Sequence, residues 1–271
     1  MGERFKLRRL SVALFVILLC SLFLLIGTGT VIGSYPGYSH LTYTLLTPVT
    51  FDAKWTTPDE WSDTTLTTFG NTSNAIFRSK WELASLDPIA VNQYIIVEIL
   101  NDNTNDSGDY WQFCFDGDES GGTAPQSGDL RIDIMGHTNL TAYAGSGTGW
   151  TSTSAPTAFQ WNNSLNTSPT SGTNHWICEI KIDKVSFGIG ADYWLRIAYY
   201  DASNAAAGAQ AWPPTSRDVP NDWGDIPYSS EAIPEGLSFG VVVLLSSVAV
   251  IIGSYYLRKR PKATILNPAR I

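Results

Sequence analysis

The chain has 271 residues, of which 44% are hydrophobic and 15% are charged, a composition that suits one medium-sized domain with accessory segments. Its net charge of -8 is unevenly distributed. Residues 1–9 and 258–271 hold nine Lys/Arg and one Glu, whereas residues 10–257 hold eight Lys/Arg and 24 Asp/Glu. Such an acidic centre repels phosphates and attracts cations, which argues against a nucleic-acid partner.

The N-terminal segment has the layout of an export signal. Arg4, Lys6, Arg8 and Arg9 precede the apolar run "LSVALFVILLCSLFLLIG", and small residues follow in "GTGTVIGS". This order predicts a secretory signal peptide over residues 1–34. The apolar run is also about as long as a short membrane span, so an uncleaved anchor stays open as the alternative. Residues 35–47 are expected to be a linker.

The C-terminal segment predicts a membrane span. Residues 237–257 contain no charge, and a basic cluster follows at Arg258, Lys259, Arg260 and Lys262. A run of 21 such residues is long enough to cross a bilayer, and the basic tail, 258–271, is expected in the cytoplasm. The acidic centre is then extracellular, joined through a linker over 227–236. As an alternative, "IPEG" before the apolar run resembles tails that exosortase or archaeosortase enzymes cut.

Five N-x-S/T sequons lie in the region that is expected outside the cell. They predict an exported, glycosylated surface at Asn71, Asn105, Asn139, Asn162 and Asn166.

Two of the three cysteines lie outside the terminal segments. Cys114 and Cys178 each occur in a strand-like run, whereas Cys20 lies in the N-terminal segment. A disulfide requires adjacent strands with Cα atoms within about 7 Å. The alternative is two separate small core residues.

The central region has the sequence pattern of an all-β domain. Short alternating runs are separated by clusters of Gly, Pro, Asn, Asp and Ser, and no amphipathic run of helical length lies between them. This pattern predicts a two-sheet, jelly-roll-like sandwich over residues 48–226. The expected strands are 74–83, 93–101, 110–116, 130–135, 140–143, 176–181 and 192–201.

An acidic loop follows the expected strand 110–116. In "DGDESG", Asp116, Asp118 and Ser120 alternate before Gly121, an arrangement typical of the start of calcium loops. Asp129 can return to the ion as the next strand begins. Ser127 stands where an EF-hand requires Glu, so the loop is not an EF-hand. The sequence predicts a structural Ca²⁺ here, with a solvated turn as the alternative.

Ten tryptophans lie between residues 55 and 223, more than a core of this size needs. Exposed indole faces stack on sugar rings, while neighbouring polar groups bind the hydroxyls. Most of these tryptophans are expected in the core. Trp150, Trp161 and Trp212 stand in polar stretches and are the predicted sugar-binding residues.

Four segments in a consistent order carry a family resemblance: residues 51–63, 110–122, 175–188 and 212–225. Together they resemble family 9 carbohydrate-binding modules and related DOMON-like sandwiches, in a form most similar to archaeal surface proteins. The resemblance covers residues 48–226 and implies a β-sandwich, a carbohydrate ligand and structural calcium. Ala53 departs from it, since Gly is usual at that position.

Motifs of common enzyme classes are missing from the sequence. It contains no G-x-S-x-G elbow and no H-E-x-x-H, and its three histidines share no metal spacing. We therefore expect a membrane-anchored extracellular module that binds a polysaccharide or envelope glycan and is not an enzyme. The alternative is a structural or adhesive envelope protein with protein partners.

Overall fold

A computed structural model describes residues 37–229, except 85–86 and 191. From Ser39 onward these residues belong to one compact unit. Both predicted terminal segments, 1–34 and 237–257, lie outside the described residues. Within the described part of the chain, no helix is long and apolar enough to cross a membrane.

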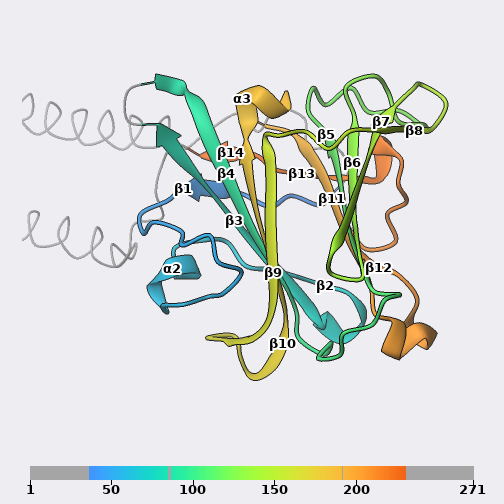
Figure 1. Ribbon diagram of the computed structural model, residues 1–271. Helices are drawn as coiled ribbons and strands as arrows, with labels where there is room; N and C mark the ends of the chain where they lie inside the picture. The colour runs from blue at the N-terminus through green and yellow to red at the C-terminus, as the bar shows by residue number, and fades with distance from the viewer. Residues whose placement is uncertain (1–36, 85–86, 191, 230–271) are drawn as a thin grey trace, which may run out of the picture. The chain divides into compact units, whose positions relative to one another are not determined.

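The described residues form two facing β-sheets, which confirms the predicted two-sheet sandwich (Figure 1). Sheet I has the order β14-β1-β3-β4-β10-β9, with β2 paired to β3. Sheet II has the order β12-β11-β5-β6-β7-β8, with β13 paired to β11. The strands of sheet I are β1 Thr42–Thr44, β2 Thr67–Phe69, β3 Ala75–Ala84, β4 Asp87–Ile99, β9 Phe159–Ser168, β10 Ser171–Asp183 and β14 Tyr228–Ser229. Those of sheet II are β5 Tyr110–Asp116, β6 Leu130–Met135, β7 Asn139–Gly145, β8 Trp150–Thr153, β11 Trp194–Tyr200, β12 Gln210–Trp212 and β13 Gly224–Asp225.

Only short helices connect these strands. They are α2 Asp59–Ser62, α3 Lys184–Phe187, and the 3-10 turns η1 Asn71–Ser73, η2 Ala202–Ala207 and η3 Pro220–Asp222.

All seven predicted strands are present: β5 and β6 have the predicted bounds, and the other five have shifted ends. The prediction omitted short strands and the ten-residue strand β9. The sandwich also includes β1 and β14, which flank the predicted domain of residues 48–226 on either side.

Strict alternation along the strands builds the core. In β5, Trp111, Phe113 and Phe115 face the other sheet and are almost fully buried. Their neighbours Gln112 and Cys114 point to the outer face of sheet II, because successive side chains of a strand alternate between faces. The inner residues of β4, β6, β10 and β11 complete the same apolar layer.

The outer face of sheet I is covered by residues 45–66, the segment that contains α2. Trp55 and Trp61 of this segment pack on Tyr94, Ile96 and Ile177 and form a second, smaller apolar cluster. Burial of two indoles on an outer face explains part of the high tryptophan content without any ligand.

A buried ion pair fixes this covering segment. Lys80 of β3 lies 3.0 Å from Asp63, and both side chains are fully buried. The other carboxylate oxygen of Asp63 accepts hydrogen bonds from the backbone N–H groups of Leu46 and Thr47. Lys80 Nζ also donates to the backbone carbonyls of Thr47 and Glu60. Removing one partner would leave the other charge buried and uncompensated.

We expect Asp63→Asn to lower the free energy of unfolding by about 3–5 kcal/mol, because Lys80 would lose its counterion in a buried site. Urea denaturation would measure the change. Adding Lys80→Met should recover part of the loss, since the unpaired charge is then gone. Asp59→Asn, an exposed change in α2, serves as the control and should cost less than about 1 kcal/mol. Equal effects of the two aspartate substitutions would contradict this role for the pair.

A buried carboxylic acid also holds the covering segment. Glu179 of β10 is 1% exposed, and its Oε2 accepts hydrogen bonds from the N–H groups of Asp52 and Ala53, at 2.9 and 2.7 Å. Ala53 has φ of 60°, a region that favours glycine, at the position where the family resemblance expects Gly. Burial, with a contribution from the Glu60 carboxylate, raises the pKa of Glu179 from 4.5 to about 8.

This raised pKa predicts a loss of stability at alkaline pH. The folded state binds the Glu179 proton more tightly than the unfolded state, so its stabilising contribution is complete below pH 4.5 and is lost as the pH rises through about 8. Glu179→Gln should flatten this part of the stability profile. Denaturation midpoints between pH 5 and pH 9 would test it, and identical slopes for the two proteins would contradict the assignment.

Candidate functional site

The outer face of sheet II carries three cross-strand rows of side chains. The strand register places Ala198, Gln112, Asp133 and Thr141 in one row. The row on one side consists of Arg196, Cys114, Arg131 and Tyr143, and the row on the other side of Tyr200, Tyr110, Met135 and Asn139. Such rows bring strand neighbours within side-chain contact.

Charged and amide groups of the first two rows form one hydrogen-bonded chain. Arg196 donates to the Gln112 side-chain oxygen, and the Gln112 amide donates to Asp133 at 3.0 Å. Arg131 binds Asp133 with two nitrogens, at 2.9 and 2.7 Å, and also contacts Asp218 at 3.1 Å. Each cation is thus held by a planar acceptor, which fixes the direction of its remaining donors.

The segment 213–223 crosses part of this face. Ser216 accepts a hydrogen bond from Arg196 through its carbonyl, and Asp218 pairs with Arg131. Cys114 is fully buried. The tyrosine row stays accessible: Tyr110 and Tyr200 are half-buried and lie parallel, with ring centroids 5.7 Å apart. Tyr143 lies under the Arg131 guanidinium, 5.1 Å from it.

A cleft opens beside Arg196. It has a volume of about 520 Å³ and runs between the β2–η1 turn and the region of β12. Most of its polar lining is neutral, from hydroxyl and amide side chains; the polar lining residues are Thr68, Asn71, Ser73, Arg196, Gln210, Thr215 and Ser216. None of its lining residues is a carboxylate.

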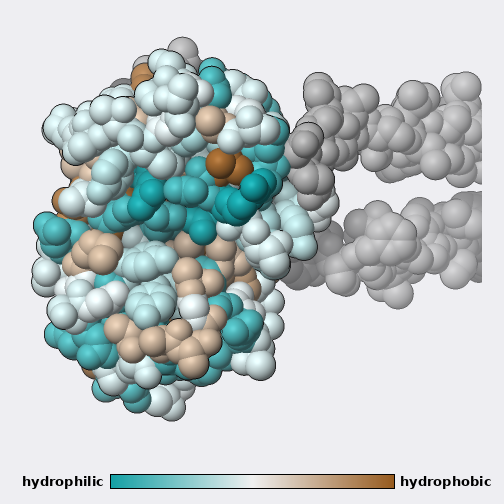
Figure 2. All heavy atoms as spheres, turned by 90° about the vertical axis from the view of Figure 1, so that its right-hand side faces the viewer, coloured by the Kyte–Doolittle hydropathy of each residue, from teal (hydrophilic) through white to brown (hydrophobic). Residues whose placement is uncertain are grey.

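Figure 2 shows the side of the molecule where sheet II lies, with a band of hydrophilic residues across its middle.

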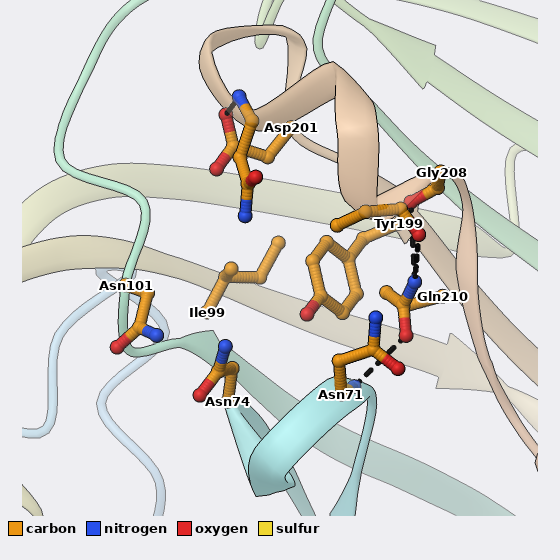
Figure 3. A pocket seen from close by; sticks show the side chains of 10 residues that line it. Asn71, Asn74, Ile99, Asn101, Tyr199, Asp201, Gly208 and Gln210 are labelled. Atoms are coloured by element: carbon orange, nitrogen blue, oxygen red, sulfur yellow. Dashed lines mark hydrogen bonds between the residues drawn. The ribbon is translucent and has the colours of Figure 1, made fainter.

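A smaller hollow lies near this cleft and shares part of its lining. Asn74, Ile99, Asn101, Tyr199, Asp201 and Gln210 are among its lining residues (Figure 3). Its volume of about 20 Å³ holds a single water, not a sugar ring. Asn71 and Gln210 line both the hollow and the larger cleft, and the Gln210 side chain accepts from the Asn71 N–H at 2.8 Å.

The predicted calcium loop brings its three carboxylates together. One oxygen each of Asp116, Asp118 and Asp129 lie within 4.8 Å of one another. Gly121, with φ of +64°, turns its N–H onto Asp116 at 2.8 Å, and Ser120 donates its N–H to Asp116 and Asp118. Ser120 therefore orders the loop through its backbone.

Asp129 supplies a carboxylate oxygen that accepts no hydrogen bond within the described residues. It is fully buried, and its Oδ1 has no hydrogen-bond partner among the described residues. Its burial, together with the charges of Asp116 and Asp118, raises the pKa of Asp129 from 3.8 to about 7. A hard cation would supply the missing partner and offset the repulsion, so these residues fit the predicted Ca²⁺.

The three predicted sugar-binding tryptophans do not share one surface. Trp212 is 3% exposed and packs in the core beside Phe77, and a Cβ at Gly224 would lie only 2.3 Å from its ring. The prediction for Trp212 is therefore wrong, because its ring has no free face. Trp150 is half-buried at the edge of sheet II and stacks parallel to Trp223 at 6.3 Å. Trp161 of β9 is half-buried and packs against the core.

The proposed disulfide is absent, and both cysteines are free and buried. Cys178 belongs to the core layer, whereas Cys114 lies on the outer face of sheet II, so the two thiols occupy different layers. Of the predicted glycosylation sites, Asn71, Asn105, Asn139 and Asn162 are exposed and Asn166 is half-buried. Glycosylation of these positions stays a prediction.

No protein-family profile matches the sequence, and no curated protein matches it. Among solved structures, the fold is similar to a family 9 carbohydrate-binding module from Caldicellulosiruptor kristjanssonii in complex with cellotriose. The identity is 14%, the TM-score is 0.48, and the match covers 74% of this chain and 98% of the module. The same kind of module from that organism in complex with glucose has 15% identity and a TM-score of 0.48, covering 71% and 97%. At these values the likeness does not assign the chain to a family.

Proposed function

We propose that this protein is a non-catalytic module that binds a neutral polysaccharide or envelope glycan in the cleft beside Arg196. Its terminal segments, 1–34 and 237–257, would display it at the outer surface of a cell membrane. A calcium ion held by Asp116, Asp118 and Asp129 would fix the loop at one end of sheet II.

The chemistry of the cleft lining carries this proposal. Hydroxyl and amide side chains offer both donors and acceptors, which is what a polyhydroxylated ligand requires. The volume of about 520 Å³ falls in the usual range for small-ligand sites. The single charged group, Arg196, is held by Gln112 and Ser216, so it is oriented before a ligand arrives.

Two further observations bear on the proposal, the first on the absence of catalysis and the second on the length of the glycan. Glycoside hydrolysis normally needs two carboxyl groups that flank the scissile bond, and no lining residue of the cleft supplies one. The parallel pair of Tyr110 and Tyr200 lies on the same outer face as Arg196 and offers ring surface for a longer glycan chain.

A blocking substitution tests the cleft. Ala209 is exposed and lines it, so Ala209→Trp should weaken glycan binding at least tenfold, about 1.4 kcal/mol. Ala205→Trp is the matched control, because Ala205 is exposed nearby in η2 but does not line the cleft. A glycan array would identify the ligand, and titration calorimetry would measure both variants. Absence of binding to every neutral glycan by the folded protein would favour the structural or adhesive alternative.

The glycan predicted at Asn71 would lie at the rim of the same cleft. The array should therefore include Asn71→Gln, which removes that sequon, so that an attached glycan does not compete with the ligand. Tyr200→Ala should weaken binding of long glycans by about tenfold and leave that of monosaccharides unchanged, because only a longer chain would reach the tyrosine pair.

The calcium site predicts a stability effect. At a Ca²⁺ concentration 100 times its Kd, the ion should add about 2.7 kcal/mol to the free energy of unfolding. Asp129→Asn should abolish binding of one ion per chain in titration calorimetry, because it removes the buried ligand. Glu119→Gln is the control in the same loop, since Glu119 is exposed and outside the cluster. Retention of that ion in Asp129→Asn would contradict the site.

A further inference from the structure

A second group of carboxylates lies at the other end of strand β5. Asp109 immediately precedes β5, whereas Asp116 of the calcium loop ends it, so the two groups are separated by the length of the strand (Figure 1). Asp102, Asp106 and Asp109 come from the β4–β5 loop, "DNTNDSGD", and Asp201 follows β11. Alternate spacing of Asp102, Thr104 and Asp106 parallels that of the predicted calcium loop.

The four carboxylates fall in two overlapping groups. One ligand atom each of Asp106, Asp109 and Asp201 lie within 4.8 Å of one another, and the same holds for Asp102, Asp109 and His137. Asp109 belongs to both groups and joins them. Asp102 and Asp109 are each 1% exposed and Asp201 is 8% exposed. Within the described residues, no Lys or Arg forms an ion pair with any of the four.

One oxygen of Asp102 has no partner. Its Oδ1 accepts hydrogen bonds from the Thr104 N–H and hydroxyl, at 3.1 and 3.2 Å. Its Oδ2 is buried and has no hydrogen-bond partner among the described residues. An unpartnered buried carboxylate oxygen is costly, and it belongs to a side chain that lies beside Asp109, the residue shared by both groups.

His137 has a different part in this arrangement. The Trp111 indole N–H can only donate, so Nδ1 of His137 accepts from it at 3.4 Å. Nε2 then carries the proton and donates to Asp109 at 2.9 Å. His137 therefore orients a carboxylate from behind, as the partners of metal-bound carboxylates do. The ligand atoms that remain are oxygens, which favour a hard cation over zinc.

We propose that Asp102, Asp106, Asp109 and Asp201 form a second divalent-cation site, which takes Ca²⁺ in preference to Mg²⁺. Oxygens from two separate loops make a site of irregular geometry, which Ca²⁺ tolerates and Mg²⁺ does not. The ion would join the two sheets, because Asp102 follows β4 of sheet I and Asp201 follows β11 of sheet II. Asp201 also caps η2, which leads to the cleft. This site does not depend on the proposed glycan binding.

Ion counting on the full chain tests the proposal. Titration calorimetry with CaCl₂ should give two ions per chain for the unmodified protein, one for Asp102→Asn, one for Asp129→Asn and none for the double variant. Asp59→Asn, an exposed control, should retain two. Terbium emission sensitised by tryptophan should fall in Asp102→Asn, because Trp176 donates to the Thr104 carbonyl within the same loop.

A second measurement separates an ion site from an internal polar cluster. Without Ca²⁺, Asp102→Asn should melt at the same or a higher temperature than the unmodified protein, because the buried unpartnered charge is gone. It should also lose part of the Ca²⁺-dependent rise in melting temperature. Two ions retained in Asp102→Asn, or an unmodified protein that binds one ion lost only in Asp129→Asn, would overturn the proposal. Equal binding of Mg²⁺ and Ca²⁺ would overturn the assigned preference.

Discussion

Alternation of side chains along each strand is the constraint on which the rest of this structure depends. Because one residue in two must enter the apolar layer, the residues between them are committed to an outer face. In β5 this places Trp111, Phe113 and Phe115 inside and Gln112 and Cys114 outside. On sheet I the outer set combines apolar residues with the buried Lys80 and Glu179, and the segment 45–66 covers it. On sheet II the outer set is polar and forms the hydrogen-bonded chain beside the cleft.

The same alternation explains which parts of the fold could be predicted from sequence. Strands such as β5 and β6 have regular apolar positions and were predicted with their observed bounds. Strand β9, "FQWNNSLNTS", was missed because Phe159 is its one buried residue, and a polar edge strand resembles a loop. Trp212 was misassigned because polar neighbours suggested exposure, whereas its burial depends on Gly224, a contact that local sequence does not reveal.

The candidate sites were predictable to different degrees. The spacing of Asp116, Asp118 and Asp129 within one loop is a local signal, and the structure brings these carboxylates together. The second acidic group needs Asp201, which is far from Asp109 in sequence and becomes its neighbour only through the pairing of β5 with β11. The cleft has no sequence motif, because its lining combines Arg196 with neutral residues of the β2–η1 turn and the β12 region, which are far apart in the sequence. The acidic composition predicts cations, not phosphates, as ligands, and this stays a prediction.

The free backbone edge of strand β9 affects the choice of expression host. It is the last strand of sheet I, ten residues long, with one backbone edge unpaired among the described strands. Such edges pair with other chains unless charge, proline or bulk prevents it. β9 contains no proline and no charged residue, but it carries two sequons, at Asn162 and Asn166. Glycans at these sites would sterically block the free edge of β9. In a host that attaches no glycans, the exposed edge could pair with a strand of another chain and cause aggregation.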